Sequence, residues 1–133
     1  IFLTPLAFGT KAGVLCLVPL AGAELVWSVK LHLLGPILHL ASFTIFVVIL
    51  GFAAGILSSR SLRQRIVISA ILYEVSLIGE ETLYYLFRML FLHKPISWAL
   101  VSETFLSPAN PILLLALILI LFHIGKRGTD GSR

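Results

Sequence analysis

Charged side chains are scarce in this chain of 133 residues. Asp, Glu, Lys and Arg make up 12% of it, against about 25% in a typical soluble domain, and 59% of the residues are hydrophobic. The apolar residues gather in runs long enough to cross a lipid bilayer. These features predict an integral membrane protein and argue against a soluble domain.

Cysteine and the common catalytic motifs are also lacking. Cys16 stands alone, which excludes a disulfide within the chain and argues against a thiolate metal site. The sequence contains no phosphate-binding loop, no dinucleotide fingerprint, no catalytic Ser–His or Cys–His signature and no nucleic-acid-binding motif. We therefore expect no enzymatic activity, no cofactor, no metal ion and no nucleic-acid partner.

Four segments have the length and composition of transmembrane helices, namely residues 12–29, 36–57, 66–92 and 108–124. Ser107 and Asn110 are expected to cap the start of the last one. Residues 1–9 are typical of the end of a preceding apolar helix, so we expect N-terminal sequence to be missing. The sequence thus predicts one all-α polytopic membrane domain over residues 1–125, with a polar cytoplasmic tail over 126–133.

Basic residues indicate how such a domain is oriented. Most of them precede the first segment, join the second to the third, or follow the fourth; they are Lys11, Arg60, Arg63, Arg65, Lys126, Arg127 and Arg133. Lys30 and Lys94 belong to the other connections. Because cytoplasmic loops of membrane proteins are enriched in Lys and Arg, this distribution predicts that both ends of the chain are cytoplasmic.

The third segment carries a stripe of polar residues. Glu74, Glu81 and Arg88 are spaced by seven residues, so they nearly superpose on one face of a helix. Tyr84 and Tyr85 flank the same stripe and are placed to bridge Glu81 and Arg88. This spacing predicts a polar seam on an otherwise apolar helix.

Two of the carboxylates are expected near the middle of the bilayer. Glu80 and Glu81 lie about 20 Å along the helix from Ile66, and Glu80 points about 100° away from its neighbour. A carboxylate at that depth must face protein or water rather than lipid. Three interpretations follow: a seam for packing against another helix or a partner, a transport or proton relay, and a catalytic pair.

Catalysis is the least supported of the three. The stretch "GEETLYYLFR" has a likeness to the EExxxR motif of the CAAX-protease family, but Tyr85 stands where that motif needs its arginine. The later HxxxN motif of that family is absent from the sequence. We favour a seam at a helix or partner interface.

Other polar and small residues lie in the apolar segments. Glu24 suggests that the first helix faces protein, and Gly51 and Gly55 form a GxxxG step that permits close helix approach. His39 and His123 lie in apolar surroundings. We favour hydrogen-bonded structural roles for them, with ligation of a tetrapyrrole as the alternative.

The order of these features resembles the MreD family of rod shape-determining proteins. "LLGPILHLASFTIFVVILGFAAGILSSRSLRQR" is similar to a small-residue-rich MreD helix followed by a basic cytoplasmic turn. "LYEVSLIGEETLYYLFRMLF" resembles the next MreD helix, which carries an acidic residue, and "FLSPANPILLLALILILFHIGKR" resembles the last one.

This resemblance implies a fold and a set of partners. It implies the C-terminal part of a six-helix fold similar to the S-components of vitamin transporters, lacking the N-terminal hairpin. It also implies a non-enzymatic scaffold of the bacterial inner membrane, working in cell-wall elongation and cell shape. Its expected partners are membrane lipid and an MreC-like subunit in a hetero-oligomer.

Two alternatives come from other functional classes. One is a small transporter or its substrate-binding component, with the same carboxylates lining a cavity at the midplane. The other is an accessory subunit of a pigment or electron-transfer complex, with His39 or His123 as an axial ligand.

Overall fold

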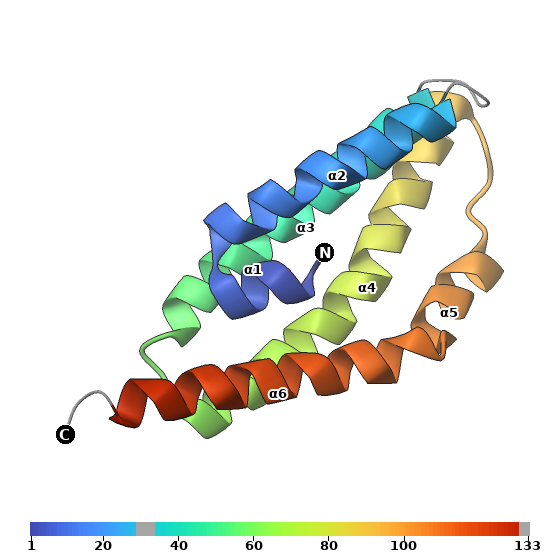
Figure 1. Ribbon diagram of the computed structural model, residues 1–133. Helices are drawn as coiled ribbons and strands as arrows, with labels where there is room; N and C mark the ends of the chain where they lie inside the picture. The colour runs from blue at the N-terminus through green and yellow to red at the C-terminus, as the bar shows by residue number, and fades with distance from the viewer. Residues whose placement is uncertain (29–33, 131–133) are drawn as a thin grey trace.

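The computed structural model describes residues 1–28 and 34–130, and this part of the chain is all-helical, without a strand. Figure 1 shows the helices, and the prediction of an all-α fold is confirmed. Their bounds are α1 Leu3–Phe8, α2 Thr10–Ser28, α3 Leu34–Leu57, α4 Leu62–Leu92, α5 Trp98–Leu106 and α6 Ala109–Asp130.

The four long helices correspond to the four predicted segments, with shifted ends. α4 begins at Leu62, four residues before the predicted start, because the Ser61 side chain accepts a hydrogen bond from the backbone N–H of Gln64. α6 continues to Asp130, so the predicted tail is helical as far as that residue. Lys30, Arg133 and the rest of 29–33 and 131–133 lie outside the described residues.

The short helix α1 lies within residues 1–9, which the sequence predicted to be the end of a preceding helix, whereas the short helix α5 was not predicted. α1 ends at Phe8, and Gly9 follows with φ of 85°, a left-handed value that glycine adopts without strain. Leu6 is 1% exposed, and α1 contacts α2, α3, α4 and α6. In Figure 1 this short helix lies among the long ones, so the opening residues contribute to the core.

Glycines allow the long helices to approach closely. A Cβ atom at Gly51 would lie 2.6 Å from the Cα atom of Thr10, so this position of the GxxxG step sits where α3 meets α2. Gly55, the other half of that step, has open space where its Cβ atom would be. At Gly79 a Cβ atom would lie 2.6 Å from the ring of Phe46, which marks the crossing of α4 and α3.

Within the described residues, two helices are long and apolar enough to cross a membrane, Leu34–Leu57 and Ala109–Arg127, where the sequence predicted four such helices. Only 33% and 17% of their apolar windows are buried, whereas the core helix of a soluble protein is mostly buried. α4 is longer than either, but glutamates and arginines are spread along it. The structure therefore supports membrane association through at least α3 and α6.

The long helices place the chain connections at two ends of the molecule. In Figure 1 the α3–α4 connection and the C-terminal end of α6 lie at one end, and the start of α3 and the end of α4 lie at the other. α5 and the start of α6 lie beside the middle of α4 rather than beside its end. The last long helix therefore does not run parallel to α4 over its whole length.

Candidate functional site

Glu80 is the most deeply buried carboxylate among the described residues, with 2% of its surface exposed. Its Oε1 atom accepts a short hydrogen bond from the Ser42 hydroxyl of α3. Ser42 itself is fully buried, and its Oγ atom also lies 2.8 Å from the backbone carbonyl oxygen of His39. His39 and Ser42 are three residues apart on one face of α3, so both turn towards α4.

His39 connects the buried carboxylate to a second one. Its Nδ1 atom lies 2.7 Å from Oε1 of Glu24 on α2, and its Nε2 atom lies 3.7 Å from Oε1 of Glu80. An ionised carboxylate only accepts hydrogen bonds, so with Glu24 in that form Nδ1 of His39 is the donor of this contact. The three residues form a chain of polar groups across α2, α3 and α4.

Aromatic rings fix the plane of the His39 imidazole. The ring centroid lies 4.7 Å from that of Phe43 on the same helix and 4.6 Å from that of Tyr84 on α4. Both ring pairs are tilted, which is a favourable aromatic arrangement. This packing and the bond to Glu24 hold Nε2 towards Glu80.

Glu81 completes a compact group of donor atoms. One atom each of His39, Glu80 and Glu81 lies within 4.8 Å of the other two. In the described part of the chain this is the group of histidine and acidic residues that comes close enough to hold a metal ion. Imidazole and carboxylate together are a donor set used for first-row transition metals.

A cavity of about 460 Å³ opens beside this group. Its lining combines two carboxylates, the histidine, two tyrosines and two basic residues; they are Glu24, Gly35, Pro36, His39, Glu81, Tyr84, Tyr85, Arg88, Leu92 and Lys94. A cavity of this size with a few convergent polar groups is typical of a small-ligand site.

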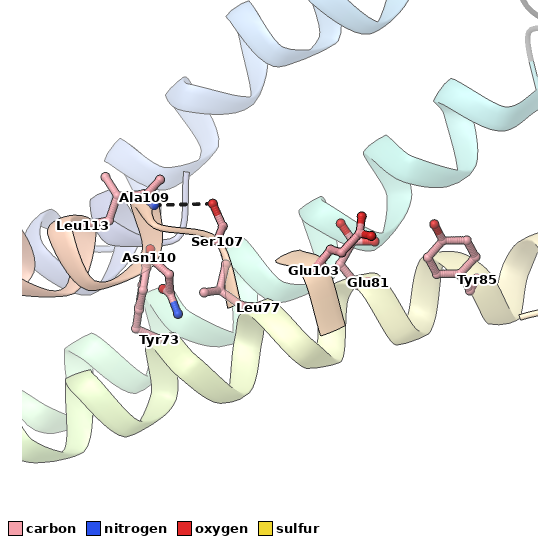
Figure 2. Close-up of a pocket in the computed structure, with 9 residues that line it drawn as sticks. All are labelled: Tyr73, Leu77, Glu81, Tyr85, Glu103, Ser107, Ala109, Asn110 and Leu113. Carbon is pink, nitrogen blue, oxygen red and sulfur yellow. Dashed lines mark hydrogen bonds between the residues drawn. The ribbon is translucent and has the colours of Figure 1, made fainter. Parts of the chain in front are cut away.

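A second cavity, of about 560 Å³, lies on the other side of α4. It is bounded by α4, α5 and the start of α6, as Figure 2 shows; its lining residues are Tyr73, Leu77, Glu81, Tyr85, Glu103, Ser107, Ala109, Asn110 and Leu113. Glu81 and Tyr85 line both cavities. These two side chains are therefore the wall that the cavities share.

Arg88 lies over the rings of two tyrosines rather than beside a carboxylate. Its guanidinium carbon is 5.5 Å from the centroid of Tyr84 and 5.4 Å from that of Tyr85, within the range of a cation–π interaction. The sequence predicted that these tyrosines would bridge Arg88 and Glu81. They lie beside Arg88, and both share a cavity lining with Glu81.

The predicted stripe is divided among different partners. Glu74 accepts a hydrogen bond of 2.9 Å from Nδ2 of Asn110 and takes no part in the lining of either cavity. Asn110 is the second residue of α6, so its side chain ties α6 to α4 instead of capping the helix. Ser107 has the expected role, since its Oγ atom accepts a long hydrogen bond of 3.4 Å from the backbone N–H of Ala109 (Figure 2).

Glu80, which the spacing set apart from the stripe, stands at the centre of the cluster. Sequence reasoning did not include Ser42, and it considered His39 only as a structural residue or a tetrapyrrole ligand, not as a partner of these carboxylates. Their signal was a pair of polar residues three apart inside the apolar run of α3. Glu24 was included, and it meets His39.

The fold and the site define the class of protein only broadly: an all-helical chain with helices suited to a membrane and a polar cluster between them. Comparison with protein-family models, with curated proteins and with solved structures gives no significant match.

Proposed function

We propose that this chain is a multi-pass membrane protein that binds a small polar solute or ion between α2, α3 and α4, as a small transporter or its substrate-binding component. The observation that carries the proposal is the 460 Å³ cavity whose lining includes Glu24, His39 and Glu81. Placing several ionisable groups among apolar helices is costly, and such groups in membrane proteins mark sites of transport or binding.

The surface of the long helices supports the membrane setting. α2, α3 and α6 each expose large apolar side chains, for example Leu15 at 70%, Phe52 at 68% and Ile112 at 69%. Exposed apolar surface of this extent is unfavourable in water and is favourable against lipid. The basic connection at Arg60 and the basic end of α6 lie at the same end of the molecule, which suits a cytoplasmic face.

The polar cluster is enclosed by the chain's own helices. Glu80 has Ser42 and His39 as neighbours within the chain, and Arg88 lies over two tyrosine rings. A seam made only for a partner helix would face outwards. The cluster instead faces a cavity, which favours ligand binding over partner binding at these residues.

A ligand screen tests this function. The purified protein in mild detergent is heated with amino acids, amines, vitamins and metal ions at micromolar to millimolar concentration. A solute that binds the folded protein stabilises it by mass action and so raises its melting temperature. At a solute concentration one hundred times the Kd, the added stability is about 2.7 kcal/mol. The effect should be lost in Glu81→Gln and kept in Glu74→Gln, because Glu74 lines neither cavity. If none of the solutes stabilises the protein, the result contradicts the proposal.

The scaffold function implied by the resemblance to MreD proteins is a second candidate. The feature that favours it is the outer face of α3, where Ile49, Phe52 and Ile56 are more than half exposed and Gly55 has open space beside it. A glycine among exposed apolar residues permits close approach of a partner's transmembrane helix. In this role the partner is an MreC-like subunit of the bacterial inner membrane.

Co-purification distinguishes the two candidates. A scaffold retains its partner in mild detergent, and Gly55→Leu should release the partner while leaving the fold intact, since the position is open within the chain. Glu81→Leu should also weaken assembly if the polar seam contributes to partner binding. Unchanged recovery of the partner with both variants would remove the scaffold candidate.

A further inference from the structure

We propose that the ligand of this site is a divalent transition-metal cation, held by Nε2 of His39 and the carboxylates of Glu80 and Glu81. This inference rests on the proposed function, because it names the class of solute that the cavity admits. It is carried by the spacing of the donor atoms, by the orientation of the imidazole and by the grouping of several carboxylates.

The donor atoms already lie near the separations of a coordination shell. Two ligands of one tetrahedral ion with bonds of about 2.1 Å are about 3.4 Å apart. Nε2 of His39 and Oε1 of Glu80 are 3.7 Å apart, and the donor atom of Glu81 is within 4.8 Å of both. Binding of the ion requires the donor atom of Glu81, a partly buried side chain, to move closer to the other two.

The imidazole is oriented as it is in metal-binding histidines. Such a residue usually donates its other ring N–H to a carboxylate, which fixes the tautomer and leaves the remaining nitrogen free to ligate. Glu24 supplies that carboxylate to Nδ1 of His39 at 2.7 Å. Ser42 orients Glu80 in a similar way, because its hydroxyl donates a hydrogen bond to Oε1 of that carboxylate.

The charges around the site also favour a divalent cation. Glu24, Glu80 and Glu81 come together among apolar helices, and bringing several carboxylates together there is costly. Arg88 lies over two tyrosine rings, and Lys94 lies in the exposed connection after α4. A divalent ion between Glu80 and Glu81 would offset part of that cost.

The 460 Å³ cavity gives the ion a route to its ligands. His39 and Glu81 line the cavity, whereas Glu80 does not and lies behind them. A hydrated cation entering from the cavity therefore meets the two partly exposed donors first and exchanges water for the buried carboxylate last. Tyr84 forms part of the same wall.

Cobalt binding tests the inference directly. The protein in detergent is stripped with a chelator and titrated with Co²⁺, whose visible d–d absorption bands report coordination by protein ligands. We expect bands that saturate at one ion per chain and that Zn²⁺ abolishes by displacement. His39→Gln, Glu80→Gln and Glu81→Gln should lose them, whereas the matched control His123→Gln, an exposed residue of α6, should keep them.

Glu24→Gln separates an orienting role from ligation. This variant keeps all three ligands, so the bands should remain while the affinity falls by about 10- to 100-fold. Gel filtration and circular dichroism show whether each variant is folded. If His39→Gln does not fold, Glu81→Gln still tests the site, because it changes a ligand that is only partly buried.

Other outcomes overturn the inference. Absence of bands in the unmodified protein, or equal bands in His39→Gln and His123→Gln, would show that His39 does not ligate the metal ion. If metals give no signal while another solute stabilises the protein through Glu81, the metal inference fails and the proposed function stands. If neither metals nor other solutes bind, both fail.

Discussion

Nδ2 of Asn110 donates a hydrogen bond of 2.9 Å to Oε2 of Glu74, and this bond fastens the first turn of α6 to the middle of α4. The amide of Asn110 is buried, so its polar atoms have little access to solvent. A polar bond of this kind between apolar helices fixes where one helix docks along the other. Its position explains why α6 starts beside the middle of α4 in Figure 1.

Removal of this bond should loosen α6. Asn110→Ala leaves the Glu74 carboxylate without its amide partner, which is expected to cost about 1–3 kcal/mol of unfolding free energy. Unfolding by denaturant in detergent measures the loss. Glu74→Ala and the double variant complete a mutant cycle, in which we expect a coupling energy of about 0.6–1.7 kcal/mol. Strictly additive effects of the two changes would show that the bond contributes nothing.

Gly79→Ala should destabilise the crossing of α3 and α4. The added Cβ atom would lie 2.6 Å from the tip of the Phe46 ring, so the ring must shift or the helices must separate, at a cost of about 1–3 kcal/mol. Phe46→Leu in the same chain should recover part of the stability by making room.

Gly55→Ala is the matched control for this change. Its Cβ atom meets open space, and alanine is the better helix former by up to about 1 kcal/mol, so the variant should be as stable as the original or more so. Equal losses at the two glycines, measured as melting temperatures, would contradict the close contact at Gly79.

Replacement of Arg88 by methionine should remove its interaction with both tyrosines. The guanidinium lies about equally far from the two rings, and a cation–π contact of this kind contributes about 0.5–2 kcal/mol. Arg88→Lys keeps the charge and should lose less. Tyrosine fluorescence and thermal unfolding of the three proteins measure the order of stability; a methionine variant as stable as the original would argue against the interaction.

Cysteine labelling tests the proposed multi-pass topology. Cys16 is the single cysteine of the chain, so Cys16→Ala provides a background without thiols. In that background Lys94→Cys should react with a membrane-impermeant thiol reagent added to intact cells. Ser59→Cys, in the basic connection between α3 and α4, should react only after the membrane is permeabilised. Reaction of both positions in intact cells would exclude the proposed arrangement.

The sequence predicted the long helices better than the polar contacts between them. The apolar runs of α3 and α6 and the helix-ending signal at His93–Pro95 each involve residues adjacent in sequence, so they can be recognised from the sequence alone. His93 does end α4, in a left-handed conformation. The contacts of Glu80 were not visible, because helical spacing gives directions on one helix and not the partner that each direction meets.

The same limit explains the other differences. Ser42 meets Glu80 across 38 positions of sequence, and Asn110 meets Glu74 across 36. Such pairings depend on how α3, α4 and α6 cross, and that follows from the fit of side chains such as Gly79 against Phe46. The sequence did predict a cap at Ser107 and a close helix approach at Gly51, because each depends on the type of one residue and its immediate neighbours.

The burial of α1 has a consequence for the order in which the chain folds. Phe2 and Leu6 share one hydrophobic cluster with Leu117 and Leu121 of α6, more than a hundred positions later. Contacts so distant in sequence are slow to form because the intervening loop must close first. During synthesis α1 can therefore pack first against α2 and α3, which it also contacts, and its contacts with α6 form last. The hairpin of α2 and α3 assembles early, and the core closes only when α6 arrives.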